Sequence, residues 1–173
     1  QQVLSGFPSA ASFQFGFFNP LYRIAYSLFD FVTAYHLLLV FFFLGAAWLT
    51  YLFIRSIGLS RSSAALGALA YALGQFNVHW ASNIAVTSSI IVLPAAFLGV
   101  YGAFSRKLRY VLLFAVVLGL SLLGAHQQFV LLALLASGAY TLFLAWGSYQ
   151  QRSSMPQVLK SLSLVLAGIA LGA

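Results

Sequence analysis

The sequence has 173 residues, of which 62% are hydrophobic and only 5% are charged. Soluble domains carry roughly 25% charged residues, so a soluble fold of this length would lack the polar side chains to cover its surface. The net charge of +7 comes from short clusters between apolar runs, which excludes a nucleic-acid-binding stripe. The absence of Cys excludes disulfides, thiolate metal sites and cysteine nucleophiles.

Residues 1–31 are predicted to form a segment at the outer membrane interface. Asn19-Pro20 is a good helix start, because Asn caps a first turn and Pro is tolerated at the first helical position. Arg23 and Asp30 are expected to share the polar face of this helix, where they could pair directly or through a partner. Its apolar stripe would lie on the bilayer.

Residues 32–173 are predicted to form an all-α, polytopic transmembrane bundle. The basic cluster 105–109 separates two charge-free runs of a little over 40 residues, 62–105 and 110–151. One crossing takes roughly 20 residues, so each run is long enough to cross twice. The predicted spans are 32–54, 62–76 (short), 84–104, 110–124, 128–147 and 161–173 (incomplete).

The short second span carries small residues at helical spacing, Ala64, Ala68 and Ala72, which let helices approach closely in lipid. A turn is predicted over 75–83, and Pro94 is expected to kink the following span. The sequence lacks an initiator Met and ends inside an apolar run, so we expect a longer parent chain.

The positive-inside rule assigns the loops to sides. Seven of the eight basic residues fall on one side, predicted to be cytoplasmic, and Arg23 is the exception. The single acid and all three His fall at or near the opposite side. Any chemistry is therefore expected at the outer face, which holds Asn19, Arg23, Asp30, His36, Asn77, His79, Asn83, His126, Gln127 and Gln128.

Two polar turns are candidate sites with open alternatives. The run His126-Gln127-Gln128 is either a hairpin tip or a polar floor that hydrogen-bonds a phosphate or sugar. His79 has the same two readings, a structural loop or a ligand contact. His36 is either a bundle hydrogen-bonding group or an axial ligand of haem or chlorophyll. The three His lack metal-site spacing, so no protein-bound metal is predicted.

Several segments together resemble a known family. They are Gly6-Phe7-Pro8, the Phe-Asn-Pro-Leu-Tyr segment 18–22, Arg55-Ser-Ile-Gly-Leu-Ser-Arg61, the small-residue run 64–76 and Gly124-Ala-His-Gln-Gln128. Their order is similar to that in the YfhO-like bacterial membrane proteins, within the set resembling GT-C-fold glycosyltransferases.

The resemblance implies a partial GT-C-like domain of the bacterial cytoplasmic membrane that uses a polyprenyl-phosphate-linked sugar at the outer face. Arg23, His79, His126 and Gln127 would then contact the lipid phosphate or the sugar. The family's acid would precede this sequence, and a divalent metal is allowed only in the full-length protein. The alternative is a non-catalytic accessory subunit that contacts other subunits of an energy-transducing membrane complex. A transporter is disfavoured, because no charge lies in mid-span.

Overall fold

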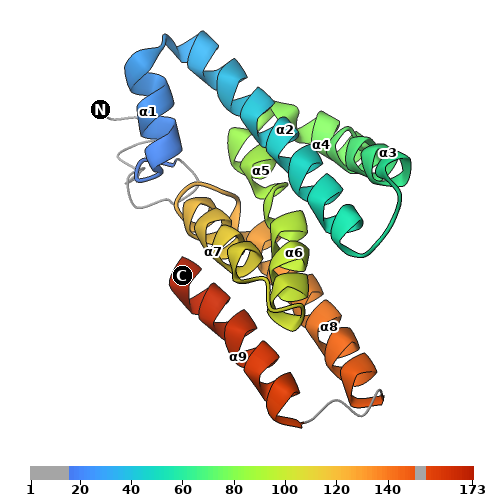
Figure 1. Ribbon diagram of the computed structural model, residues 1–173. Helices are drawn as coiled ribbons and strands as arrows, with labels where there is room; N and C mark the ends of the chain where they lie inside the picture. Colours follow the sequence, from blue (N-terminus) through green and yellow to red (C-terminus); the bar gives the residue numbers. More distant parts are fainter. Residues whose placement is uncertain (1–15, 151–154) are drawn as a thin grey trace.

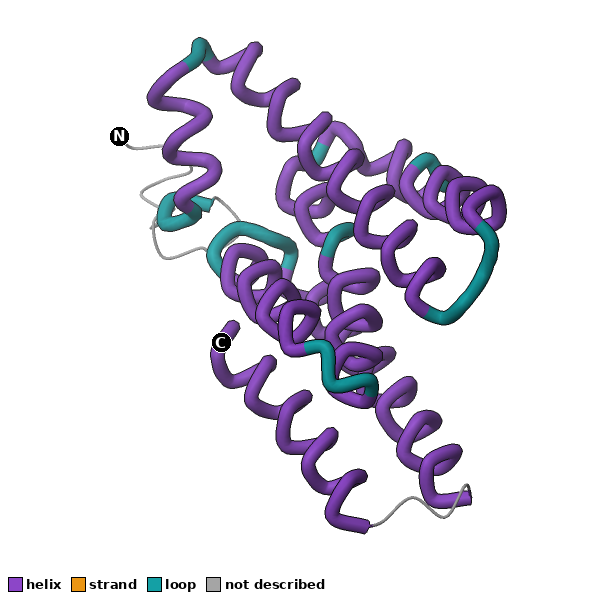
Figure 2. Tube along the Cα trace, viewed as in Figure 1, coloured by secondary structure: helices purple, strands orange, loops and turns teal. Residues whose placement is uncertain are grey.

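The structure is a computed structural model that describes residues 16–150 and 155–173, and these residues form helices joined by turns, with no strand (Figure 2). Three described helical segments are long and apolar enough to cross a membrane: Phe31–Ser56, Ile84–Phe104 and Gln127–Ser148. The prediction of an all-α bundle with transmembrane helices is confirmed. The segment Gly6-Phe7-Pro8, which is part of the family resemblance, lies outside the described residues.

The helix α1 (Pro20–Leu28) begins where the sequence predicts. The Asn19 Oδ1 atom accepts a hydrogen bond from the Leu21 N–H at 2.9 Å. The Asn19 Nδ2 atom donates to the Leu120 carbonyl at 2.8 Å, which holds α1 against the end of another helix. One residue thus caps α1 and attaches it to the bundle (Figure 1).

The expected common face of Arg23 and Asp30 is wrong, because α1 ends at Leu28. Asp30 instead caps the next helix, α2 (Phe31–Ser56), where its carboxylate accepts from the N–H groups of Val32 and Thr33, each at 3.1 Å. The only acid in the sequence therefore has a structural role at a helix start.

Acid is expected to weaken this cap. The pKa of the Asp30 carboxyl is held below its ordinary value, chiefly by the Thr33 side chain and N–H. A depressed pKa stabilises the fold above the unfolded pKa of about 3.9 and loses that stability as the pH falls. The variant Asp30→Asn keeps a capping side chain without the titration. In thermal unfolding in detergent, we expect wild type to be the more stable at neutral pH and the difference to vanish in acid. A difference that does not depend on pH would contradict the cap.

A buried central helix organises the bundle. It consists of α5 (Ile84–Ser89) and α6 (Val92–Phe104). Of the residues in its most apolar stretch, 78% are buried, compared with 28% in α2 and 22% in the span Gln127–Ser148. Around it lie α2, α7 (Leu108–Leu122), α8 (Gln127–Gln150) and α9 (Met155–Gly172) (Figure 1). The outer helices thus present most of their apolar surface outwards, as a lipid-embedded bundle requires.

The helix α3 (Arg61–Ala72) packs on α2 through its small residues. Ala64, Ala68 and Ala72 are all buried. A Cβ on Gly67 would lie 2.5 Å from the Ile54 Cδ1 atom of α2, so the end of the Ile54 side chain packs directly over this glycine. This confirms the close-packing face predicted from the sequence.

The predicted turn over 75–83 is instead largely helical. It contains α4 (Gln75–His79) and the 3₁₀ helix η3 (Trp80–Ser82), so the chain is helical on both sides of a break at Leu73-Gly74. The predicted kink is present, but the central helix is interrupted at Ile90-Ile91, one turn before Pro94. Because a proline ring meets the carbonyl four residues earlier, the distortion falls on the N-terminal side.

The bundle has two ends. Tyr35 of α2 donates to the Ala81 carbonyl at 3.1 Å, and the His126 N–H donates to the Ala85 carbonyl at 2.8 Å. These bonds gather the start of α2, the η3–α5 loop and the α7–α8 turn, which we name the histidine end. The α2 and α5–α6 segments run from there to the turns 57–60 and 105–107, which we name the arginine end (Figure 1).

Candidate functional site

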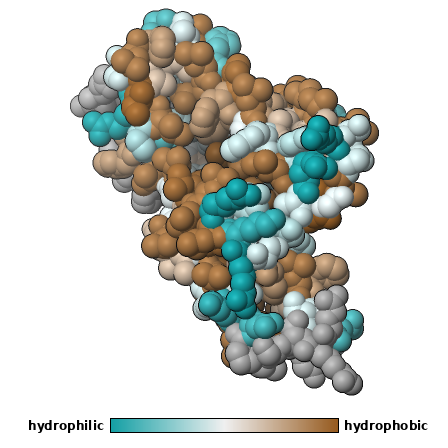
Figure 3. All heavy atoms as spheres, in the orientation of Figure 1, coloured by the Kyte–Doolittle hydropathy of each residue, from teal (hydrophilic) through white to brown (hydrophobic). Residues whose placement is uncertain are grey.

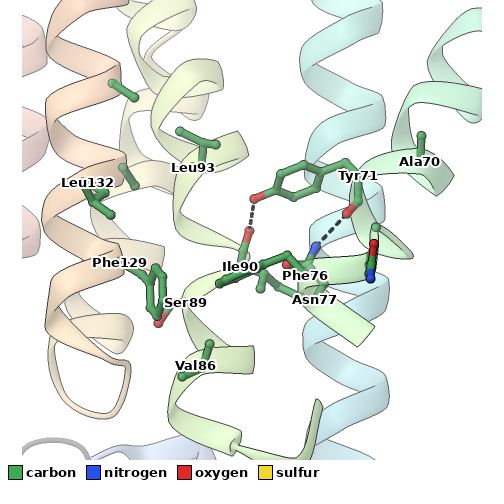
Figure 4. A pocket seen from close by; sticks show the side chains of 14 residues that line it. Ala70, Tyr71, Phe76, Asn77, Val86, Ser89, Ile90, Leu93, Phe129 and Leu132 are labelled. Atoms are coloured by element: carbon green, nitrogen blue, oxygen red, sulfur yellow. Dashed lines mark hydrogen bonds between the residues drawn. The ribbon is translucent and has the colours of Figure 1, made fainter. Parts of the chain in front are cut away.

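A groove of about 590 Å³ opens between α3–α4 on one side and α8 on the other, with α5–α6 as its floor (Figure 4). Its size falls within the roughly 300–1,000 Å³ typical of ligand pockets, which are mostly apolar with a few placed polar groups. No charged residue is among those that line it: Ala70, Tyr71, Gly74, Gln75, Phe76, Asn77, Val86, Ser89, Ile90, Leu93, Phe129, Leu132, Ala133 and Ala136.

The floor of the groove contains the helix break at Ile90-Ile91. A side chain from the wall of the groove donates a hydrogen bond to the carbonyl that this break leaves without a helical partner. Pro94 has no N–H, so the Ile90 carbonyl four residues earlier loses its helical partner. The Tyr71 hydroxyl of α3 donates to this carbonyl at 2.7 Å (Figure 4). The Tyr71 hydroxyl thus replaces the hydrogen-bond donor that Pro94 lacks.

The wall of the groove holds the second break, at the end of α3. Asn77 of α4 turns back and its Nδ2 atom donates to the carbonyls of Tyr71 at 2.6 Å and Ala72 at 3.4 Å. Asn77 therefore belongs to the loop's own framework. Non-helical backbone at membrane depth is tolerated only where protein buries it or where it lines a cavity, and here both breaks line the groove.

A series of ring contacts extends from the groove to the histidine end. The Phe76 and Phe129 rings pack edge to face, with 5.4 Å between their centroids. Phe76 also contacts Trp80 at 6.5 Å, and His79 contacts Trp80 at 5.6 Å. On the other side, His126 contacts Phe129 at 5.3 Å. Two of the sequence-predicted site residues, His79 and His126, are therefore joined through the aromatic rim of one groove.

The backbone N–H of His126 is hydrogen-bonded, whereas the Nδ1 atom of its ring is not. Its N–H donates to the Ala85 carbonyl and also lies 3.1 Å from the Ser89 Oγ atom, and Ser89 lines the groove. Among the described residues, no hydrogen-bond partner is found for the buried Nδ1 atom of His126. Buried polar atoms are normally paired, so this unpaired nitrogen is unusual. His126 itself does not line the groove, and its ring adjoins it through Phe129.

The other predicted site residues lie at the same end but outside the rim. Gln127 and Gln128 are exposed in the first turn of α8, so the connection before them is shorter than the predicted tip. Arg23 is exposed on α1. The His36 Nδ1 atom lies 2.7 Å from the Val32 carbonyl of its own helix.

Tyr22 supports the α7–α8 turn that carries His126. Its hydroxyl lies 3.4 Å from the Gly124 carbonyl and 3.5 Å from the Ile84 carbonyl. Burial raises the pKa of Tyr22 to about 12, so the hydroxyl stays protonated and remains a donor at physiological pH. The position of the turn is thus set from α1.

Sequence reasoning missed Tyr71, Phe76, Ser89 and Phe129. The apolar pattern treats all four as ordinary core. One signal was available, because Pro94 implies a carbonyl at Ile90 that needs a donor. That rule does not say which side chain supplies it.

No family model, curated protein or solved structure matches this chain. The fold and the groove define its class directly: a membrane-embedded, all-α bundle with a mostly apolar groove between two interrupted helical segments.

Proposed function

We propose that this chain is the lipid-binding part of a GT-C-like glycosyltransferase of the bacterial cytoplasmic membrane. It takes the isoprenoid chain of a polyprenyl-phosphate-linked sugar into the groove between α3–α4 and α8. The glycosyl-transfer part of the proposal rests on the family resemblance. The single observation that carries the lipid-binding part is the groove itself, apolar along its length and bordered by His79 and His126 at one end.

The polar head of the lipid would then lie at the histidine end. The Nδ1 atom of His126 is buried and has no hydrogen-bond partner among the described residues, and a rotation of the ring towards the groove would bring it to a phosphate or a sugar hydroxyl. His79 and Gln127 are exposed beside it, and Arg23 on α1 supplies positive charge at the same end. This end would face the outside of the cell, and the arginine end the cytoplasm, as the positive-inside rule requires.

The transfer reaction needs a carboxylate that this chain does not provide. Glycosyl transfer requires an acid or base at the reacting carbon, and Asp30 is the only acidic residue in the sequence. Its carboxylate is engaged by two N–H groups at the start of α2. The catalytic acid is therefore assigned to another part of the full-length protein.

Blocking the groove tests the proposal. Ala70 and Ala65 are both exposed alanines of α3, and only Ala70 lines the groove. We expect Ala70→Trp to weaken binding of a photoreactive polyprenyl phosphate about ten-fold or more, which corresponds to about 1.4 kcal/mol. The matched variant Ala65→Trp should bind like wild type. Equal labelling of all three proteins would rule out the groove as the lipid site.

The same assay separates the enzyme from the accessory-subunit alternative. An accessory subunit would co-purify in fixed stoichiometry with a larger complex and would bind polyprenyl phosphate no better than a bilayer phospholipid. In the full-length protein, His126→Ala should reduce lipid-linked sugar transfer while leaving the amount of folded protein unchanged. Unchanged turnover would remove His126 from the site.

A further inference from the structure

A second, smaller cavity lies at the arginine end, where α6 ends. The helix ends at Phe104, and the next turn closes with hydrogen bonds from the Lys107 N–H to the Gly102 carbonyl at 2.7 Å and from the Arg106 N–H to the Ala103 carbonyl at 3.4 Å. This is the Schellman arrangement, which puts one residue in the left-handed region, usually glycine. Here that residue is Arg106, with φ of 56°.

The comparison with α2 shows what is unusual. After α2 the equivalent position is Gly58, with φ of 95°, as helix ends prefer. A side chain in this conformation costs free energy. Arginine is therefore not explained by the turn, and the position of its side chain suggests a reason.

The Arg106 side chain lines a small polar cavity of about 90 Å³ between the α6–α7 turn, the end of α8 and the start of α9. This is several times the roughly 10–15 Å³ needed for one ordered water. Its other polar lining residues are neutral: Ser148, Gln157 and Ser161. Ser148 and Gln157 carry groups that can donate hydrogen bonds, whereas the Ser161 hydroxyl donates to the Gln157 carbonyl at 3.1 Å. No carboxylate lines the cavity.

Neighbouring cations have other contacts. The Lys107 ammonium lies 5.4 Å from the centre of the Tyr101 ring, and the Arg109 guanidinium lies 4.9 Å from the centre of the Tyr110 ring. For the Arg106 guanidinium, no hydrogen bond, ion pair or ring contact occurs with the described part of the chain. Arg106 is exposed, so its charge faces the cavity and the solvent.

Nothing acidic lies nearby to balance this charge. The sequence has one acidic residue, Asp30, and it caps α2 at the histidine end. On the face shown in Figure 3, hydrophilic side chains gather over the α6–α7 turn, beside apolar surface. A cationic cavity with hydroxyl and amide donors fits an anion with several acceptor oxygens.

We propose that this cavity, the Arg106 cavity, binds the phosphate group of an anionic phospholipid. Basic pockets between helices on the positively charged side of a membrane protein are suited to such headgroups. The exposed apolar residues of the adjoining helices, including Phe143 of α8 and Leu159 of α9, provide surface for the acyl chains. The site lies at the opposite end from the groove and does not depend on the proposed function.

Lipid titration of the full-length protein by native mass spectrometry tests the site, with dioleoylphosphatidylglycerol as the probe and dioleoylphosphatidylcholine as the neutral comparison. We expect Arg106→Gln to raise the Kd for the anionic lipid about five-fold or more, the size of one basic contact at a membrane surface. The control Arg109→Gln, outside the cavity, should stay close to wild type.

A second variant keeps the result interpretable. Arg106→Gly removes the charge but suits the left-handed turn, so it should melt at or above the wild-type temperature while losing the lipid as Arg106→Gln does. Equal weakening by Arg106→Gln and Arg109→Gln would overturn the site in favour of a diffuse surface charge. Equal affinity for the neutral lipid, or full displacement of the lipid by inorganic phosphate, would overturn the assignment to an anionic lipid.

Discussion

Replacing Gly99 with Ala is expected to destabilise the bundle by about 1–3 kcal/mol, the usual cost of overpacking a core. Gly99 lies on the buried face of α6, against α7. A Cβ there would lie 2.6 Å from the Phe114 Cβ atom and 2.9 Å from its Cγ atom. The clash involves atoms next to the α7 backbone, so a side-chain rotation cannot relieve it. Thermal or denaturant unfolding in detergent measures the effect.

Gly138→Ala on α8 is the matched control. A Cβ at Gly138 meets nothing within 4 Å, so the substitution adds no contact. Alanine favours helix over glycine by about 1 kcal/mol, so this variant should be as stable as wild type or more so. A similar loss of stability in both variants would contradict the close α6–α7 packing.

Tyr71→Phe is expected to cost about 1–3 kcal/mol, the penalty for leaving a buried polar group unpaired. The change removes one hydroxyl and leaves the Ile90 carbonyl without its 2.7 Å partner. Because the ring is retained, the groove keeps its apolar wall. The free energy of unfolding, measured alongside polyprenyl phosphate binding, would separate a structural loss from a loss of ligand contact.

A double-mutant cycle with Pro94→Ala isolates the cause. Alanine at position 94 restores an N–H that can bond the Ile90 carbonyl within the helix. Tyr71→Phe should then cost less in the Pro94→Ala background than in wild type, with a coupling of about 1 kcal/mol. Additive losses would show that the hydroxyl and the proline do not act on the same carbonyl.

The membrane-spanning helices follow directly from the sequence. Long apolar runs must be helical to satisfy their backbone in lipid, and 31–56, 84–104 and 127–148 are such helices. The alanine face of α3 was also predictable, because Ala64, Ala68 and Ala72 recur at helical spacing. Composition and the helical spacing of residue types suffice to predict these features.

The interrupted segments could be predicted only in part. Pro94 indicates a kink, but apolar periodicity does not show that α3 ends at Leu73-Gly74 or that a second helix, α4, follows at once. Asp30 falls at the helical spacing from Arg23 that favours a shared face, yet it is a better cap than a helix residue. Capping depends on where α1 ends, and no local pattern fixes that point.

The candidate site depends on contacts between distant parts of the chain. His79 and His126 were predicted as candidates because they lie in polar turns at the outer face, but the contacts that connect them come from the rings of Phe76 and Phe129. The sequence alone does not show which neighbouring helix an aromatic residue of a membrane helix contacts. The left-handed Arg106 was likewise hidden within a basic cluster whose role in topology was evident.

The most direct test of the account is the sidedness of the two ends. The sequence has no Cys, so Gln128→Cys and Ser105→Cys each introduce a unique exposed thiol, one at the histidine end and one at the arginine end. In intact cells, a membrane-impermeant maleimide should label Gln128→Cys at once and Ser105→Cys only after permeabilisation. Labelling of both positions from the same side of the membrane would contradict the account.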